Sequence, residues 1–334
     1  MILAGDIGGT NTRLALFEMK DGQPRGVTEE IYPSHDYGGL EEIIEKFLRS
    51  HPAKLDSAGI GIAGPIRDGR CVATNLPWVV DCRTVVARIG VADVVLLNDL
   101  ESNAYGIATL SPSDFLVLQG GAANPAGNAA VISAGTGLGE AGLYWDGAQL
   151  HPFPSEGGHS SFAPEGDLAF ELLQYLAKRY GHVSCERVIS GPGLHSIFEF
   201  LCDTGRGHAP DWLIEEMRNG DPSAAISRAA LDNRSDLCTQ TLDLFVRAYG
   251  AEAGNLALKV LATGGVYLGG GIAPKIRKKL QDGAFIEAFL EKGRMRSLLV
   301  TIPVRIVLNE NTALRGAARG AWLRTAAAPK ATRA

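Results

Sequence analysis

The chain has 334 residues, of which 46% are hydrophobic and 21% charged, and its 32 basic and 37 acidic residues give a formal net charge of −5. This composition is typical of folded proteins and excludes wholesale disorder, and the length predicts two domains or one large domain. The negative charge argues against nucleic acid as a partner, and no run of about 18 strongly apolar residues predicts a membrane span. The opening segment MILAGDIGG lacks the order of regions found in a signal peptide, so we expect a cytoplasmic protein.

The numbers and spacing of cysteine and glycine narrow the class of protein further. The five cysteines are scattered and none is spaced as C-x-x-C, so neither a disulfide framework nor a thiolate zinc site is expected. Glycine supplies 41 of the 334 residues, about 12% against roughly 7% in an average protein. The glycines stand in short clusters beside apolar segments, which predicts sharp turns or close approach of the backbone to a ligand.

The first third of the chain alternates between strand and helix patterns. Alternating apolar residues predict a strand over Arg13–Glu18, and Asp21-Gly22 after it is a hairpin signal. Apolar residues at 40, 43, 44, 47 and 48 predict a helix over Leu40–Leu48. The other elements expected here are strands over Ile2–Ala4, Ala58–Ala63 and Val91–Leu97 and a helix from about Leu100 to Thr109. Such alternation predicts an α/β domain with a largely parallel sheet.

A similar order of elements restarts further along. The segment SAGTGLGEAGLYWDG, like GDIGGTNTRLALF and its following Asp-Gly, gives strand, glycine loop, strand and Asp-Gly turn. We interpret the chain as two related halves, each opening with a hairpin that faces phosphate. The elements expected here are strands at Phe115–Leu118, Ala129–Ser133, the start of Gly264–Pro274 and Val304–Leu308, helices within 167–259 (clearest at Leu168–Leu176 and Leu242–Ala262), at Lys275–Leu280 and at Thr312–Thr325, and a frayed tail over 326–334.

The loop between the first two expected strands carries a candidate phosphate site. Consecutive glycines at Gly8-Gly9 expose backbone N–H groups with no side chains in the way, which suits phosphate oxygens. Asp6 precedes them, where a carboxylate can hold a magnesium ion through water, and Thr10 adds a hydroxyl. The alternative is a tight hairpin with a solvated Asp6. The carboxylate, the two glycines and the Thr-Asn-Thr run together favour phosphate.

Two familiar nucleotide loops are excluded. No glycine is followed by lysine, so the chain has no P-loop. A G-x-G-x-x-G string occurs at Gly137–Gly142, but a dinucleotide fingerprint needs a helix after it. Here Leu143–Gly147 follows, which is typical of a strand and a turn.

Two further groups of polar residues are candidates for chemistry. Asn98-Asp99 follow an apolar run, and a carboxylate at the carboxyl end of a strand can act as a general base in phosphoryl transfer or merely cap the next helix. In Glu156-Gly157-Gly158-His159 the two glycines let a carboxylate and an imidazole face one ligand. Such groups suit sugar hydroxyls, and no third histidine or carboxylate nearby supports a metal site instead.

Six motifs in this order, GDIGGTNTR, LLNDLESNAYGI, SAGTGLGEAGLY, PSEGGHSSFAP, ERVISGPGL and GGVYLGGGIAPKI, resemble the bacterial glucokinase family of the hexokinase branch of the actin-like ATPases. The resemblance runs from about residue 3 to about residue 323 and is to the zinc-free branch, because the cysteine and histidine cluster of the other branch is missing. It implies two actin-like (ribonuclease H-like) α/β domains with an active-site cleft between them. It also implies phosphorylation of the glucose 6-hydroxyl by ATP with Mg²⁺, as the first step of glycolysis, usually by a homodimer.

The resemblance also assigns roles. It makes Asp99 the general base and places a magnesium ion near Asp6, through water. The implied hexose ligands are Asn98, Glu156, His159 and Glu186, and the implied ATP-binding residues are Gly5, Asp6, Ile7, Gly8, Gly9, Thr10, Gly135, Thr136, Gly137, Gly269 and Gly270. Thr74–Trp78 resembles a loop on the sugar side, with no contact assigned to Asn75 or its neighbours.

The expected domains are a small one with the first phosphate loop and Asp99, over 1–109 and 311–325, a large one over 110–310, and a flexible tail over 326–334. Three alternatives stay open at this level. A kinase for fructose, mannose or an amino sugar would use the same motifs. A sugar-responsive repressor would need a DNA-binding domain before Gly5 and a basic field. An actin-like ATPase acting on proteins would not need the EGGH or NDLESNA motifs, and its hydrolysis of ATP would be stimulated by protein alone.

Overall fold

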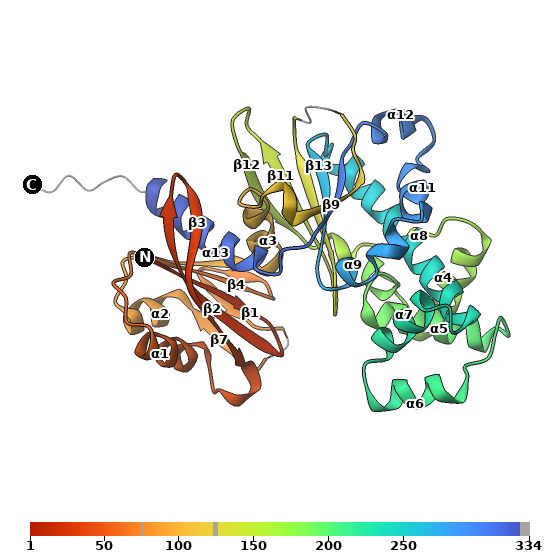
Figure 1. The fold of residues 1–334 in the computed structure, drawn as a ribbon, viewed down its shortest axis with the longest axis horizontal. Coiled ribbons are helices and arrows are strands. Elements are labelled where there is room, and N and C mark those ends of the chain that lie inside the picture. The colour runs from red at the N-terminus through yellow and green to blue at the C-terminus, as the bar shows by residue number, and fades with distance from the viewer. Residues whose placement is uncertain (75, 123–125, 328–334) are drawn as a thin grey trace, which may run out of the picture. The chain divides into compact units, whose positions relative to one another are not determined.

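The computed structural model of the protein describes residues 1–74, 76–122 and 126–327, so Asn75 and the end of the predicted tail, 328–334, lie outside the described residues (Figure 1). The chain forms two compact units. Unit 1 contains residues 1–112, 151–154 and the chain from 309 onward, and unit 2 contains 113–150 and 155–308. Within the described ranges, no helix has the length and apolar character needed to cross a membrane.

Unit 1 is built on a sheet with the strand order β3-β2-β1-β4-β8, beside a small sheet with the order β5-β6-β7. The strands are β1 (Ile2–Ile7), β2 (Asn11–Lys20), β3 (Gln23–Pro33), β4 (Ser57–Ile62), β5 (Ile66–Arg67), β6 (Arg70–Val72), β7 (Val79–Asp81) and β8 (Val94–Asn98). β1 is antiparallel to β2 and parallel to β4, and β4 is parallel to β8. The carboxyl ends of β1, β4 and β8 therefore meet at one edge of the sheet.

Helices cover both faces of the unit 1 sheet. They are η1 (Ser34–Asp36), α1 (Leu40–Ser50), α2 (Cys82–Ile89), α3 (Asp99–Ile107) and α13 (Thr312–Ala327). Alternate residues of β1 face opposite sides, so Leu3 joins the core under α1 and α2 while Ile2 and Ala4 pack under α13. α3 and α13 cross closely, because a Cβ at Gly316 would lie 1.7 Å from the Ser102 carbonyl oxygen.

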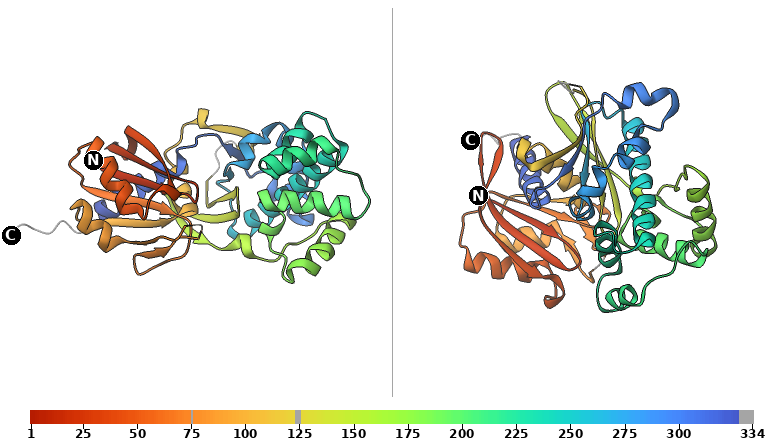
Figure 2. Two further views of the ribbon diagram at one scale, coloured as in Figure 1. Left: turned by 90° about the horizontal axis from the view of Figure 1, so that it is seen from below. Right: turned by 45° about the vertical axis from the view of Figure 1, so that its right-hand side comes forward.

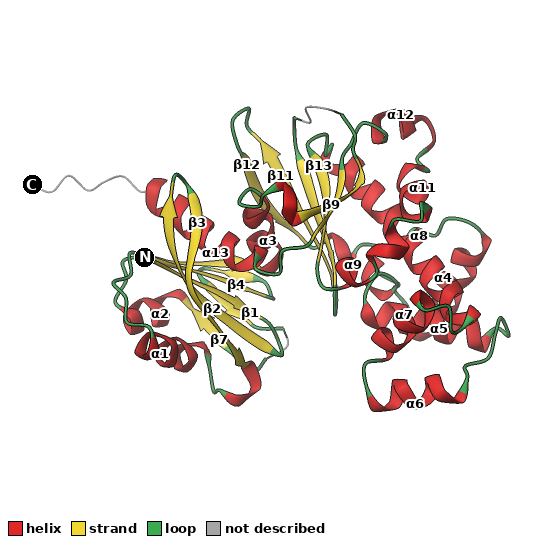
Figure 3. Ribbon diagram, viewed as in Figure 1, coloured by secondary structure: helices red, strands yellow, loops and turns green. Residues whose placement is uncertain are grey.

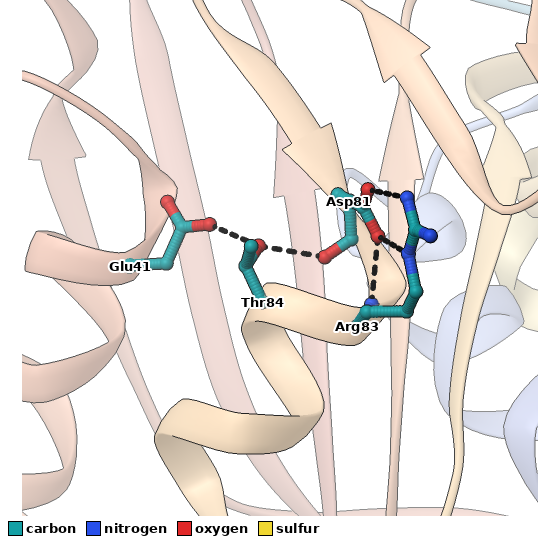
Figure 4. A network of polar contacts seen from close by, with 4 residues as sticks. All are labelled: Glu41, Asp81, Arg83 and Thr84. Atoms are coloured by element: carbon teal, nitrogen blue, oxygen red, sulfur yellow. Dashed lines mark hydrogen bonds and ion pairs between the residues drawn. The ribbon is translucent and has the colours of Figure 1, made fainter.

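The amino-terminal turn of α2 is held by side chains (Figure 4). Asp81 is its N-cap and accepts hydrogen bonds from the Arg83 backbone N–H at 2.9 Å and from its guanidinium at 3.0 and 2.6 Å. The Thr84 hydroxyl lies 2.8 Å from the Asp81 carbonyl oxygen and 2.7 Å from a Glu41 carboxylate oxygen of α1. This network ties α2 to α1.

The second large sheet has the strand order β12-β11-β10-β13-β14-β9 and belongs to unit 2, except for residues 151–154 of β12, which are grouped with unit 1. The strands are β9 (Phe115–Gln119), β10 (Ala129–Ala134), β11 (Leu138–Trp145), β12 (Leu150–Ser155), β13 (Gly265–Gly269) and β14 (Val304–Val307). The helices are η2 (Pro112–Asp114), η3 (Gly157–His159), α4 (Asp167–Tyr180), η4 (Cys185–Arg187), α5 (Gly191–Asp203), α6 (Asp211–Asn219), α7 (Pro222–Leu231), α8 (Asp236–Val260), α9 (Ile272–Lys275), α10 (Arg277–Leu280), α11 (Ala284–Leu290), η5 (Gly293–Met295) and α12 (Arg296–Leu299).

α8 packs against β10 and β13 of this sheet, and α5, α7 and α11 pack against α8. The helices α4 to α8 gather on one side of the sheet (Figures 2 and 3). The ring of Tyr249 on α8 meets that of Phe285 on α11 edge to face at 5.5 Å, and both side chains are fully buried. The core of unit 2 therefore runs continuously from sheet to helices.

The two sheets confirm the repeated pattern predicted from the sequence. The order β3-β2-β1-β4-β8 of unit 1 recurs as β12-β11-β10-β13-β14 in unit 2, which adds β9 antiparallel to β14. The predicted hairpin turn at Asp21-Gly22 is present, and both residues have positive φ angles, of 53° and 74°, as a type I′ turn requires.

Some predicted bounds were wrong, and several elements were not predicted. The strand expected over Val91–Leu97 begins at Val94 and extends to Asn98. The helix expected at Lys275–Leu280 is two short helices, α9 and α10, that meet at Ile276. β3, β5 to β7, β12 and α2 had no counterpart in the sequence analysis. β3 and β12 are mostly exposed, so their sequences lack the apolar alternation of a half-buried strand.

Candidate functional site

The edge of the unit 1 sheet where the parallel strands end brings two carboxylates together. Asp6 of β1 lies level with Gly61 of β4, and Asn98 ends β8 one position further along. The pKa of Asp6 is raised from its ordinary value of 3.8 to about 6, first by burial and second by the nearby Asp99 carboxylate, while the Arg13 guanidinium lowers it. Two carboxyl groups, Asp6 and Asp99, therefore lie near each other at this partly buried edge of the sheet.

Asn98 and Asp99 form the start of α3. The Asn98 side chain is the N-cap, and its Oδ1 accepts a hydrogen bond from the Leu100 N–H at 3.0 Å. Asp99 is the first residue of the helix, and its Oδ1 lies 3.0 Å from the same N–H. The capping interpretation is thus correct for Asn98. Asp99 is partly exposed at a helix amino terminus, where the helix dipole favours a negative charge.

The first glycine loop is a tight hairpin between β1 and β2. The Gly8 N–H donates to the Asn11 carbonyl at 2.9 Å, and Ser34 of η1 binds the Gly8 carbonyl through its hydroxyl at 2.8 Å. Gly5 and Ile7 are buried in the sheet, where a Cβ at Gly5 would lie 2.9 Å from Ile60. Of the residues predicted to bind ATP in this loop, Asp6, Gly8, Gly9 and Thr10 retain exposed surface.

The second glycine loop, Gly135–Gly137, joins β10 to β11 in unit 2. The Gly135 N–H donates to the Gly137 carbonyl, and the Gly191 N–H at the start of α5 donates to the Gly135 carbonyl, both at 2.8 Å. Ser190 caps α5, and the Ser223 hydroxyl near the start of α7 donates to the Gly191 carbonyl at 2.8 Å. The amino termini of α5 and α7 therefore stand beside this loop, and such termini favour anions.

A cavity of about 670 Å³ opens at these helix termini, a size within the range of small-molecule sites. Its lining is Gly135, Thr136, Gly191, Pro192, Leu194, His195, Asp221, Pro222, Ser223, Ala224, Ser227, Gly271, Ile272, Lys275 and Ile276.

The third glycine cluster meets this cavity through Gly271, whose side-chain position is open space. Gly269 and Gly270, the residues predicted to bind ATP, lie behind it: a Cβ at Gly270 would lie 2.4 Å from the Ala134 carbonyl oxygen. The sequence analysis missed the cavity residues on α5, α7 and α9. The signals that mark them are Gly191-Pro192 and Asp221-Pro222, which place proline in the first turn of a helix.

The residues predicted to bind sugar in unit 2 lie on two segments that are hydrogen-bonded to each other. The Cys185 N–H donates to the Ser160 carbonyl and the Phe162 N–H to the Val183 carbonyl, both at 2.9 Å. This pairing holds η3, which follows Glu156 and ends at His159, beside η4, which contains Glu186. Glu156 and His159 are exposed.

Glu186 also belongs to the second glycine loop. Its Oε2 accepts a hydrogen bond from the Leu138 N–H at 3.0 Å, and a Cβ at Gly137 would lie 2.5 Å from the same oxygen. One carboxylate thus joins the second glycine loop to the segments that carry the predicted sugar residues, a link that no sequence spacing shows.

The predicted site residues therefore fall into two sets. Asp6, Gly8–Thr10, Asn98 and Asp99 lie in unit 1, and Gly135–Gly137, Glu156, His159 and Glu186 lie in unit 2. The first set offers carboxylates for proton transfer or a hard cation. The second offers backbone N–H donors, helix termini and groups that match sugar hydroxyls. Among the described residues, no three histidine, cysteine or acidic side chains are grouped so as to hold a metal ion by themselves.

Comparison with known proteins gives a consistent result. The family model described as Glucokinase matches residues 3–324. The glucokinase of Nostoc punctiforme is 43% identical over 333 residues, which cover 95% of this chain and 98% of that protein. A crystal structure of a glucokinase from an Antarctic psychrotroph is 33% identical with a TM-score of 0.85, covering 96% of this chain and 98% of the other. A ROK family glucokinase from Streptomyces griseus, solved with glucose and AMPPNP, shares the fold at 21% identity and a TM-score of 0.65, covering 96% and 99%.

Proposed function

Because the chain belongs to the glucokinase family and is a kinase that phosphorylates glucose with ATP, we propose that it transfers the γ-phosphoryl group of magnesium-bound ATP to the glucose 6-hydroxyl, with Asp99 as the general base. The observation that carries this assignment is the position of Asp99. It starts a helix at the carboxyl end of β8, beside Asp6 and in the same unit as the first glycine hairpin.

In this mechanism the Asp99 carboxylate accepts the proton of the 6-hydroxyl as its oxygen attacks the γ-phosphorus and ADP leaves. The helix amino terminus at Asp99 favours the charged form of its carboxylate, which is the form that can accept that proton. The Asn98 amide binds a neighbouring hydroxyl, and its hydrogen bond to the Leu100 N–H fixes its orientation. Exclusion of water from the site would prevent it from taking the place of glucose as the nucleophile.

The nucleotide is assigned to the cavity of unit 2. Its glycines admit a ribose or base against the backbone, and the Thr136 hydroxyl with the amino termini of α5 and α7 favours phosphate at its edge. We assign phosphate binding to Gly8–Thr10 as well, on the family resemblance of the first glycine loop.

Asp6 fits a magnesium ion. Mg²⁺ prefers oxygen ligands, keeps several waters and is bound by one or two carboxylates together with substrate phosphates. Burial and the nearby Asp99 carboxylate both raise the pKa of Asp6, and a bound cation would counter both effects. When bound, the ion would neutralise phosphate charge, and Asp6 would hold it through water.

Glu156, His159 and Glu186 are assigned to the sugar hydroxyls other than the 6-hydroxyl. Carboxylate and imidazole groups accept and donate hydrogen bonds with defined directions, so their arrangement can discriminate one hexose from its epimers. Glucose is the substrate that the family membership favours, with other hexoses as outcomes of the test below.

The cellular setting is part of the same proposal. Phosphorylation of glucose by ATP is the entry step of glycolysis and takes place in the cytoplasm. All five cysteines are free thiols, which agrees with a reducing compartment. We assign a homodimer on the family resemblance, to be measured by light scattering of the intact chain in solution.

The experiment measures ADP release by the full chain with ATP and a panel of glucose, fructose, mannose and glucosamine, with Mg²⁺ and with excess EDTA. We expect glucose to give the highest kcat/KM and EDTA to abolish turnover. Equal ADP release without any sugar would contradict the assignment and favour an ATPase. A higher kcat/KM for another hexose would reassign the substrate.

Asp99→Asn tests the base. It keeps the size of the side chain and removes the proton acceptor, so kcat should fall at least about 10²-fold while glucose binding changes little. Asp93→Asn is the matched control, because it makes the same change just before the other end of β8, on a carboxylate that pairs with Arg324. Unchanged turnover in Asp99→Asn would overturn the assignment.

A further inference from the structure

A buried carboxyl group in unit 2 has no role in the assignments above. Glu140 lies on β11 with only 1% of its surface exposed, and its Oε1 is buried without a hydrogen-bond partner among the described residues. An unsatisfied buried polar atom destabilises the fold by about 1–3 kcal/mol, and more when it is charged. A leucine or methionine at this place in the core would avoid that penalty.

The surroundings of Glu140 connect it to the predicted sugar residues. A Cβ at Gly157 would lie 2.0 Å from the Glu140 Oε2, so the carboxyl group fits directly against the backbone between Glu156 and His159. Only glycine at position 157 leaves room for it. The adjacent Gly158 is equally confined, because its Cβ would lie 2.0 Å from the Leu138 carbonyl oxygen on the same strand.

Three further groups face this carboxyl group. Glu252 of α8 is also buried, with 4% exposed, and it accepts hydrogen bonds from the Lys259 ammonium and the Asn255 amide at 3.0 Å each. The Cys185 thiol of η4, one residue before Glu186, is close enough to both glutamates that their charges raise its pKa, and it donates to the Ser161 carbonyl at 3.7 Å. The cluster of Glu140, Cys185, Glu252 and Lys259 therefore touches both segments that carry the sugar residues.

We propose that Glu140 is a positioning residue of the hexose site, whose carboxyl group supports the Glu156–His159 loop from below and fits it for sugar only while the group is uncharged. The inference rests on the proposed function, because it takes Glu156 and His159 as ligands of the hexose.

The charge of Glu140 follows from its surroundings. The pKa of Glu140 is raised from 4.5 to about 7, first by burial and second by the Glu252 carboxylate, while the Lys259 ammonium lowers it. Burial raises the pKa of the Cys185 thiol to about 12, so the thiol stays neutral and does not compete. Above pH 7 the Glu140 carboxylate faces that of Glu252, and the repulsion pushes on the backbone at Gly157.

The experiment measures kcat and the KM values for glucose and ATP of the magnesium–ATP enzyme from pH 6 to pH 9. The wild-type KM for glucose should rise about three- to tenfold across this range beyond the rise in Glu140→Gln, which cannot ionise. The KM for ATP should show no such difference. Glu199→Gln, a surface carboxylate paired with Arg179, is the control and should follow the wild type.

Lys259→Met is the second variant, because it leaves Glu140 in place and changes only a half-exposed neighbour. Loss of the ammonium removes the group that lowers the pKa of Glu140, so the pH at which the KM for glucose rises should move upward. A merely structural role would leave this midpoint where it is.

Two results would overturn the inference: a Glu140→Gln enzyme that keeps the wild-type pH profile, or a Lys259→Met enzyme with an unmoved midpoint. Glucose binding measured by calorimetry over the same pH range separates this inference from the proposed function. Binding that follows the expected pH dependence without phosphorylation would contradict the function and support Glu140. Phosphorylation without the pH dependence would support the function and contradict the inference on Glu140.

Discussion

The glycine loops of the two units occupy the same place in sheets of the same strand order, between one strand and its antiparallel neighbour. What surrounds them differs. The unit 1 loop has the carboxylates of Asp6 and Asp99 nearby. The unit 2 loop has the amino termini of α5 and α7, and a cavity of about 670 Å³ beside them.

The difference arises at one connection. In unit 1 the chain passes from β3 to β4 through η1 and α1, whereas the equivalent passage from β12 to β13 in unit 2 contains η3, η4 and α4 to α8. That long connection supplies Glu156, His159 and Glu186 as well as both helix termini. On the proposed assignments, unit 1 therefore supplies carboxylates for proton transfer and for a cation. Unit 2 supplies groups that bind the sugar and the nucleotide. Variants of Asp6 and Asp99 in unit 1 should lower kcat, and variants of the residues assigned to sugar and nucleotide in unit 2 should raise KM.

Asp6→Asn, in unit 1, should lower kcat more than any variant of the unit 2 loops. We expect kcat to fall about 10²-fold and the Mg²⁺ concentration for half-maximal activity to rise at least about tenfold, because a neutral amide holds the ion poorly. Titration of activity against Mg²⁺ measures both. Asp36→Asn, on the exposed surface of unit 1, should change neither.

Although Asp6→Asn should lower activity, it should raise the stability of the metal-free protein. The folded protein binds more protons at Asp6 than the unfolded chain between pH 3.8 and about 6, so the stability of the metal-free protein falls as the pH rises through that range. At pH 7 the variant should gain roughly 1–3 kcal/mol in chemical denaturation. A loss of stability would show that Asp6 serves the fold.

Glu140 allows the same argument in unit 2. Its pKa of about 7 exceeds the ordinary value of 4.5, so the stability of the wild type should fall as the pH rises from about 4.5 to 7 and stay lower above that. Glu140→Gln lacks this loss, and its stability relative to the wild type should increase by roughly 1–3 kcal/mol between pH 5 and pH 8. Urea denaturation at the two pH values measures the difference. A constant difference would contradict the raised pKa.

Much of the fold could be predicted from the sequence because the buried elements carry strong periodic signals. β1, β4, β8, β10 and β13 are buried apolar runs, and α1 presents Ile43, Ile44 and Phe47 to the core. Exposed elements such as β3 and β12 lack that signal. α2 buries only Val85, and the N-cap at Asp81 was the one mark of its start.

The site was predictable where a motif is continuous in sequence. The carboxylates at the ends of β1 and β8 follow from the rule that ligands gather at the carboxyl ends of parallel strands. Contacts between distant segments were not predictable. The hydrogen bond from Leu138 to Glu186 and the packing of Glu140 against Gly157 depend on how β11, η3 and η4 meet.

Glu186→Gln should lower activity less than the variants of the unit 1 carboxylates, Asp6→Asn and Asp99→Asn. The amide keeps one acceptor for the Leu138 N–H but loses the charge that binds a sugar hydroxyl, so the KM for glucose should rise about tenfold with a smaller change in kcat. Steady-state kinetics with glucose and with ATP separate the two substrates. A fall in kcat alone would move Glu186 from binding to chemistry.

The smallest effects are expected at Gly270 and Gly271, two adjacent glycines that differ in the space around a Cβ. Gly271 faces open space in the cavity, so Gly271→Ala should leave the melting temperature unchanged and raise the KM for ATP about threefold by crowding the nucleotide. Gly270 has a φ of +78° and no room for a Cβ, so Gly270→Ala should cost more than about 1 kcal/mol of stability. Thermal denaturation and the KM for ATP, measured on both variants, test the contrast. An unchanged KM in a stable Gly271→Ala enzyme would place the nucleotide outside this cavity.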